Sequence, residues 1–517
     1  MSIAAPVAAT SLAGAAAAEL AVLERAAGDG DEGARIALAD RLLSTHRHDT
    51  PEHRRGLELL RAAADGPRWR DACWRLGAYY LQVTVWPDAH AQAAQWLERA
   101  AQAGVAPAID RLATLHLQGL GVGFDPARAL RLQTHLADAG FQQAAWETGY
   151  LRDQFGEGTP GDAASAFARA CALGYPPAYY SLGLRMARAA SDTRDAAFAR
   201  ALLLRAADAG FPDGRAAADE LVPEALCGAA AIQWHARLKQ NLVAARSLLN
   251  QLAPTDAPLD RPALHPRLPQ VEAHFAGIGH PAIGLDAHGR LRVVDSAVGS
   301  LRAAPSALQW LCREPKIAVS RGFASREECA HLMHKVAPSL RRADAYVKRD
   351  RDNDASEASQ FDGQGHPPGA LHADAVVRLI ERRIVAAAGW NMAALEPHSV
   401  IRYQPGEQYL PHVDSFTPEQ IARDRARGDF GGQRSVTFLL CLRAPDEGGE
   451  TWFHHPQLAV PGLAGQALLH YNAVPDGGMD VQSLHSGRPV VRGEKWMWRS
   501  TLREHSLYPT GADIAPA

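Results

Sequence analysis

The chain has 517 residues, more than one hydrophobic core usually serves, so its length predicts about two to four domains. Hydrophobic residues make up 47% of the chain and charged residues 21%, which is typical of a globular protein and excludes a largely disordered one. The formal net charge of −3 gives no electrostatic reason to expect a nucleic-acid partner. After the Ala-rich start, no uncharged apolar stretch of about 18 residues occurs, so we expect no membrane span.

The cysteines and the N-terminal segment bear on the cellular compartment. The six cysteines are scattered and form no Cys-x-x-Cys pair, so we expect neither a disulfide framework nor a zinc ribbon. The Ala-rich segment 1–33 has no Lys or Arg before Arg25, so it lacks the basic start of a secretory signal. Both features favour a reducing, cytoplasmic location.

Residues 34–220 contain an internal repeat. Five short blocks, each ending in glycine, follow one another at spacings of 38, 36, 34 and 36 residues. Their closing glycines are Gly66, Gly104, Gly140, Gly174 and Gly210. Each block predicts a helix, a turn and a second helix, which ends at a glycine in the left-handed conformation. Since one such pair cannot bury its own apolar face, the pairs should stack into an α-solenoid.

This pattern resembles Sel1-like repeats, which are relatives of tetratricopeptide repeats. The stretch GLGVGFDPARAL (119–130) is the closest match. The resemblance implies an interaction scaffold that binds a protein or peptide. The fourth block departs from the pattern with DQFGEGTPGDAASAF (153–167), so we expect its helix pair to be shortened.

The middle of the chain predicts a cap and a linker. Residues 221–252 favour one or two further helices that close the array. In region 253–310, the stretch 253–269 carries five spaced prolines, which predict a stiff extended linker. The stretch AIGLDAHGRLRVVD (282–295) predicts a short hairpin.

A His and an Asp stand two residues apart in YLPHVDSF (409–416). On a strand, residues i and i+2 point to the same face, so His412 and Asp414 should converge. A third ligand is available in a second β-rich segment, where His485 precedes a Gly-Arg-Pro turn. Two imidazoles and one carboxylate with open positions are the ligand set of non-haem Fe(II) oxygenases.

Other residues in this part of the chain suggest a carboxylate site. Lys495 follows His485 by ten residues, and its ammonium, with the hydroxyls of Tyr403 and Thr437, would form a charge-assisted site for the distal carboxylate of 2-oxoglutarate. We expect His454 and His455 to be loop residues that follow a strand. His470 is expected in the core or the cavity wall, so none of these three histidines is expected to be an iron ligand.

The C-terminal segment resembles the prolyl 4-hydroxylase family of Fe(II)/2-oxoglutarate dioxygenases. Matching blocks occur in the family's order at 401–414, 434–442, 447–453, 465–472 and 484–496. The resemblance implies a double-stranded β-helix (jelly-roll) domain with flanking helices over 311–507, followed by a tail at 508–517. It also implies Fe(II) held by His412, Asp414 and His485, with Lys495, Tyr403 and Thr437 binding 2-oxoglutarate.

The resemblance implies a hydroxylase of an unactivated C–H bond, with L-ascorbate as a further candidate cofactor. Peptidyl proline is the expected substrate, and the repeat array is expected to recruit it. Cys441 and Thr501 stand where the family commonly has Tyr and Trp, so a free amino acid or small metabolite is an alternative substrate. A catalytically degenerate adaptor is another alternative. Two long segments, 348–369 and 417–433, are expected to be loops that shape substrate access.

Overall fold

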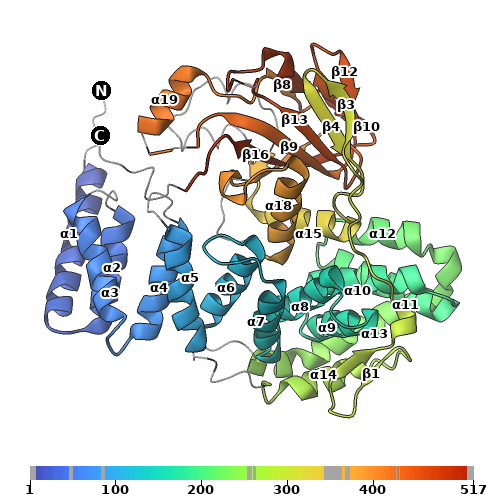
Figure 1. The fold of residues 1–517 in the computed structure, drawn as a ribbon. Helices are drawn as coiled ribbons and strands as arrows, with labels where there is room; N and C mark the ends of the chain where they lie inside the picture. Colours follow the sequence, from blue (N-terminus) through green and yellow to red (C-terminus); the bar gives the residue numbers. More distant parts are fainter. Residues whose placement is uncertain are drawn as a thin grey trace.

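The structure is a computed structural model. It describes residues 7–45, 50–82, 88–252, 259, 264–342, 364–366, 373–426, 428–429, 431–474 and 476–508. Figure 1 shows an arc of helices, formed by the N-terminal half, with the β-sheets of the C-terminal half above it. Within the described residues, no helix has both the length and the apolar character needed to cross a bilayer.

The arc consists of antiparallel helices that follow one another along the chain. They are α1 (Val7–Gly28), α2 (Glu32–Thr45), α3 (Pro51–Ala63), α4 (Trp69–Gln82), α5 (Ala89–Gln102), α6 (Ala106–Gln118), α7 (Pro126–Asp138), α8 (Gln142–Phe155), α9 (Pro160–Ala172), α10 (Pro176–Ala189), α11 (Thr193–Asp208) and α12 (Gly214–Leu221). Each helix packs on its neighbours in sequence, so the predicted stack of helix pairs is present.

The repeat glycines behave as predicted at four of the five positions. Gly104, Gly140, Gly174 and Gly210 have φ values of 78°, 95°, 81° and 81°, in the left-handed region. The prediction is wrong for Gly66, which is not in that region. Pro67 follows it, and the residue before a proline is biased toward extended backbone.

The expected shortening of the fourth block is also wrong. Helix α8 has 14 residues and α9 has 13, as in the other blocks. Gly156 ends α8 with φ 71°, and Thr159 forms a reciprocal capping box with Asp162 at the start of α9. The left-handed glycine ends α8 and the capping box starts α9 within a short turn, so neither helix is shortened.

The middle region folds back onto the array. It contains α13 (Glu224–Leu252), which has a non-helical residue at Gly228, then α14 (Leu268–Ala276) and the predicted hairpin of β1 (Ile283–Leu285) and β2 (Leu291–Val293). The hairpin segment is tied to α9, because the Val293 amide donates to Ser165 Oγ at 2.9 Å.

The predicted proline-rich linker can be followed only in part. Residues 253–258 and 260–263 lie outside the described residues. Pro269 lies in the first turn of α14, so the prediction of extended chain up to 269 is wrong there. A proline is tolerated in the first turn of a helix, where its missing N–H would have had no partner.

The C-terminal half contains antiparallel sheets. The larger has the order β3-β4-β13-β9-β16-β7-β6-β5, a smaller one has the order β12-β11-β14-β8, and β10 pairs with β15. The strands are β3 (Gln309–Arg313), β4 (Lys316–Ser320), β5 (Arg341–Arg342), β6 (Gln364–His366), β7 (Ser399–Tyr403), β8 (Tyr409–His412), β9 (Arg434–Arg443), β10 (Glu447–Gly448), β11 (Thr451–Phe453), β12 (Leu458–Val460), β13 (Ala467–Tyr471), β14 (His485–Gly487), β15 (Val490–Arg492) and β16 (Lys495–Arg503). These antiparallel sheets, with flanking helices, are typical of a jelly-roll oxygenase domain.

One of the two expected loops is partly helical. Helix α19 (Pro418–Ala426) occupies much of 417–433. The Thr417 amide donates to Gln420 Oε1 at 2.8 Å, and the Gln420 amide donates to Thr417 Oγ1 at 3.3 Å. Thr-Pro-Glu-Gln is thus a capping-box signal with proline in the first turn, which the loop prediction overlooked. Most of 348–369 lies outside the described residues, and 364–366 form strand β6.

Helices α15 (Arg326–Val336) and α18 (Ala375–Ala388) lie between the sheets and the array (Figure 1). They contact α6, α8 and α10, which each begin a repeat. Buried side chains from the array, from both helices and from the larger sheet form one continuous hydrophobic cluster. One face of the array is therefore occupied by the chain's own C-terminal half.

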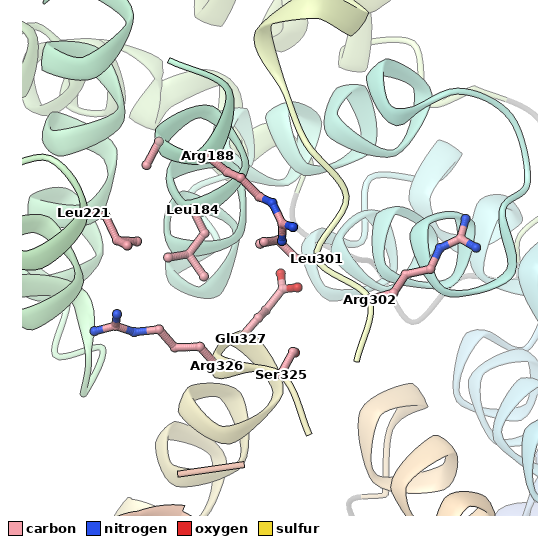
Figure 2. Close-up of a pocket in the computed structure, with 9 residues that line it drawn as sticks. Leu184, Arg188, Leu221, Leu301, Arg302, Ser325, Arg326 and Glu327 are labelled. Atoms are coloured by element: carbon pink, nitrogen blue, oxygen red, sulfur yellow. The ribbon is translucent and has the colours of Figure 1, made fainter. Parts of the chain in front are cut away.

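Buried ion pairs cross this junction. Arg185 of α10 is 1% exposed and donates to Glu327 of α15 at 2.8 and 2.9 Å and to Asp153 at 2.6 Å. Figure 2 shows Glu327 pointing from the start of α15 toward α10, beside a pocket whose Arg302 and Arg326 point away from each other. Because these charges are out of water, each needs its ionic partner, and the partner of Glu327 lies across the junction.

We predict that Arg185→Met destabilises the whole chain. It leaves the Glu327 and Asp153 carboxylates buried without their counter-charge, which costs about 3–5 kcal/mol. Urea and thermal unfolding, followed by circular dichroism, measure the effect. The control is Arg194→Met in the exposed ion pair with Asp192, which should be close to neutral. Equal stability of both variants would contradict a structural role for the buried pair.

Candidate metal centre and cosubstrate cavity

The pairing of β8 with β14 brings two histidines together. His412 and His485 are directly opposite each other in this antiparallel pair. Asp414 lies two residues beyond the end of β8. Its Oδ1 is 3.5 Å from His412 Nε2, and its Oδ2 is 3.8 Å from His485 Nε2. One donor atom of each residue lies within 4.8 Å of the others, so the three are spaced to hold one ion.

Backbone carbonyls orient both imidazoles. His412 Nδ1 lies 2.8 Å from the Leu410 carbonyl oxygen, and His485 Nδ1 lies 3.0 Å from that of Ser483. A carbonyl accepts, so each Nδ1 carries the proton and each Nε2 presents a lone pair toward Asp414. Metal-ligating histidines are held in this way, and the donor set fits Fe(II).

The Asp414 carboxylate is held from behind. Thr437 Oγ1 donates to Asp414 Oδ2 at 2.6 Å, and Asn472 Nδ2 donates to Thr437 Oγ1 at 2.8 Å. Burial raises the pKa of Asp414, but its contacts with His412 and His485 and the positive charge of Arg499 outweigh this effect, so the pKa lies well below its usual range. Asp414 is therefore ionised and ready to bind a cation.

A further histidine lies behind the centre. His470 is fully buried, its Nε2 is 3.6 Å from Asp414 Oδ2, and its ring is in edge contact with His485. Burial lowers the pKa of His470 to about 4, so it is neutral at physiological pH. This matches its prediction as a core histidine. His454 and His455 follow β11 in a turn, as predicted.

A small cavity adjoins the candidate metal centre. Besides His412, Asp414 and His485, its wall includes Ile401, Tyr403, Leu439, Lys495, Met497 and Arg499. Lys495 is opposite Tyr403 in the pairing of β16 with β7, and its Nζ lies 5.6 Å from the Tyr403 ring centre. Burial lowers the pKa of Lys495 to about 8, against opposing effects of Cys441 and Glu450. A buried lysine on the cavity wall can form a charge-assisted hydrogen bond with a carboxylate that enters the cavity.

The sequence-predicted cosubstrate contacts differ in their surroundings. Lys495 and Tyr403 lie on the cavity wall, whereas the Thr437 hydroxyl donates to Asp414. Thr437 as a cosubstrate contact stays a prediction. The position of Arg499 on the cavity wall was not predicted from the sequence, although Arg499 stands four residues after Lys495 and strand alternation puts both side chains on one face.

We predict that His412→Ala and His485→Ala each weaken Fe(II) binding by about a hundredfold or more, because each removes one of only three protein donors. Anaerobic equilibrium dialysis measures the metal affinity. His454→Ala is the control, since His454 bonds to Ser486 rather than to the three ligands, and it should bind Fe(II) like the parent. Unchanged affinity in His485→Ala would rule out the three-residue centre.

We also predict that 2-oxoglutarate binding weakens as the pH rises. The protonated Lys495 binds the carboxylate better, and with a pKa of about 8 it loses its proton between pH 7 and pH 9. Affinity should fall roughly tenfold from pH 7 to pH 9, since each unit above the pKa is worth a factor of ten. Dialysis with Mn(II) as a redox-inert ion tests this. Lys495→Arg, which stays charged, should flatten the profile; a flat profile in the parent chain would count against Lys495.

Comparison with known proteins identifies the same oxygenase family that the sequence analysis predicted for the C-terminal part of the chain. The 2OG-Fe(II) oxygenase superfamily matches residues 398–500, which include all three candidate ligands and Lys495. Prolyl 4-hydroxylase 5 of Arabidopsis thaliana is 33% identical over 217 residues, covering 38% of this chain and 70% of the relative. Prolyl 4-hydroxylase 13 of the same plant is 28% identical over 214 residues, covering 38% of this chain and 74% of the relative.

Solved structures resemble each half separately. A viral collagen prolyl hydroxylase from Paramecium Bursaria Chlorella virus-1 is 20% identical with a TM-score of 0.28, covering 37% of this chain and 98% of that one. A Sel1 repeat protein from Oxalobacter formigenes is 24% identical with a TM-score of 0.35, covering 51% of this chain and 78% of that one. On its sequence relatives, the chain belongs to the prolyl 4-hydroxylase family of 2OG-Fe(II) oxygenases and is a 2-oxoglutarate-dependent dioxygenase.

Proposed function

We propose that this dioxygenase hydroxylates prolyl residues of a protein or peptide, with His412, Asp414 and His485 as the Fe(II) ligands. The observation that carries the proposal is the convergence of these three side chains beside a cavity that contains a buried lysine. The names of the relatives support proline as the hydroxylated residue. In the reaction, 2-oxoglutarate, O2 and a C–H bond become succinate, CO2 and a C–OH group.

The chain's own residues bind and orient the reactants. Fe(II) with 2-oxoglutarate, when bound, supplies the oxidising power that an unactivated C–H bond requires. Lys495 and Tyr403 grip the distal carboxylate of the cosubstrate at the far end of the cavity. Ile401 and Met497 are opposite each other on paired strands, and their side chains make the wall of the cavity apolar there, which would exclude water. Because the bound cosubstrate is held in a fixed position beside the metal site, the reacting groups no longer have to meet by diffusion.

We further propose that the repeat array recruits the protein substrate. The face formed by α6, α8 and α10 contacts α15 and α18, so recruitment uses another surface. On α4, Trp69 is half-buried and lies under the guanidinium groups of Arg70 and Arg99, at 5.7 and 5.4 Å from its ring centre. Trp and Arg are enriched where proteins bind one another, so this cluster supports a docking role.

The first experiment measures succinate release with Fe(II), 2-oxoglutarate and ascorbate in the presence of poly(L-proline), a (Pro-Pro-Gly) repeat peptide or free L-proline. We expect stimulation by at least one peptide, and hydroxyproline in that peptide by mass spectrometry. Hydroxylation of free L-proline alone would favour a small-metabolite enzyme. Absence of succinate under every condition, including uncoupled turnover, would favour a degenerate adaptor.

The second experiment tests recruitment with point variants. Truncating the array would expose the buried charges around Arg185, so Trp69→Ala is the better probe. We expect a several-fold higher KM for an intact protein substrate and an unchanged KM for a short peptide, because only the protein reaches α4. Val243→Ala, at an exposed apolar position on α13, is the control. An unchanged KM for the protein substrate would argue against docking on α4.

A further inference from the structure

Strand β16 places a second cation in the cavity. Lys495, Met497 and Arg499 alternate along this strand, so all three side chains point to the same face, and all three line the cavity. Lys495 and Arg499 are four residues apart, which separates their Cα atoms by about 13 Å along the strand. The cavity therefore has a positive group toward each of its ends.

Strand register shows which end each cation occupies. On β7, Lys495 is opposite Tyr403 and Arg499 is opposite Ser399; on β9, Arg499 is opposite Leu439. Two residues before Leu439 on the same face of β9 stands Thr437, whose hydroxyl holds the Asp414 carboxylate. Arg499 is thus at the metal end of the cavity, and Lys495 is at the opposite end.

The wall of the cavity contains two cations. Among the described residues that line it, Asp414 is the one carboxylate, whereas Lys495 and Arg499 are both cations. The Arg499 guanidinium also helps to hold the pKa of Asp414 below its usual range, so its charge acts at the metal end. A cavity with one cation toward each end is complementary to an anion with a carboxylate at each end.

We propose that Arg499 binds the C1-carboxylate of 2-oxoglutarate, next to the metal, while Lys495 binds the C5-carboxylate. The proposal rests on the proposed 2-oxoglutarate site and adds a second anchor to it. A guanidinium presents a planar fork of N–H donors that matches a carboxylate, which an ammonium does not. The two anchors together would select a 2-oxo acid by its length and by its second carboxylate.

The test compares two cosubstrate probes in the full-length, Fe(II)-loaded protein. 2-Oxopentanoate has the chain length of 2-oxoglutarate but lacks its C5-carboxylate. Anaerobic titration, followed by the visible absorption of the Fe(II) chelate, measures the Kd of each probe without turnover. For Arg499→Gln we expect both Kd values to rise by a similar factor of about ten to a hundred, as for loss of a charge-assisted hydrogen bond. For Lys495→Gln we expect the Kd of 2-oxoglutarate alone to rise.

Three controls separate the possible causes. Arg402→Gln removes an arginine from the opposite face of the neighbouring strand β7, where it pairs with Glu494, and should leave both Kd values unchanged. Arg499→Lys keeps the charge and should lie between the parent and Arg499→Gln, which covers the case in which the glutamine variant does not fold. Fe(II) affinity, measured by dialysis without either probe, should be the same in the parent and in Arg499→Lys.

Two results would overturn the assignment of Arg499. One is a change of less than twofold in both Kd values for each Arg499 variant. The other is a rise for 2-oxoglutarate with none for 2-oxopentanoate, which would put Arg499 at the C5 end. Failure of the parent protein to bind 2-oxoglutarate at all would instead contradict the proposed function, so the two ideas fail in different ways.

Discussion

The alternation of side chains along β16 is the constraint on which both halves of the molecule depend. Trp496 and Trp498 point to one face, where they join the cluster shared with α15, α18 and the array. Lys495, Met497 and Arg499 point to the other face and line the cavity. A slip of one residue in register would exchange these faces, burying two cations in the hydrophobic core and turning two tryptophans into the site. The site is therefore as rigid as the core packing behind it.

The array and the oxygenase share more than a surface contact. Besides Arg185, the Glu328 carboxylate of α15 accepts from Tyr150 of the array and from Arg383 of α18. Burial and the neighbouring Glu328 raise the pKa of Tyr150 well above its usual value, so its hydroxyl stays protonated and donates. Such groups tolerate burial only while all of them are in place. An array that served only to bind a substrate would not need buried polar contacts with the oxygenase domain.

Much of the architecture could be predicted from the sequence, because repeats, strand alternation and glycine stops are local signals. The three candidate ligands were also found, since His412 and Asp414 are two residues apart and His485 stands in a matching block. The junction could not be predicted: nothing near Arg185 in the sequence indicates that its partner, Glu327, lies 142 residues away. Arg499 and the α19 cap were missed for another reason, because their signals, alternation from Lys495 and Thr-x-x-Gln, were present but not applied.

The hydrogen bond from Thr437 to Asp414 would influence how many oxygens of this carboxylate bind the metal. Oδ2 is engaged by the Thr437 hydroxyl, so Asp414 has Oδ1 to offer and would act as a monodentate ligand. If both oxygens bound the ion, one coordination position fewer would remain. The Fe(II) centre of such an enzyme has to accept a chelating 2-oxo acid and O2 together, which requires every position that the protein leaves vacant. The Thr437 hydroxyl would thus favour binding of Fe(II) through Oδ1 alone, which would leave positions for both cosubstrates.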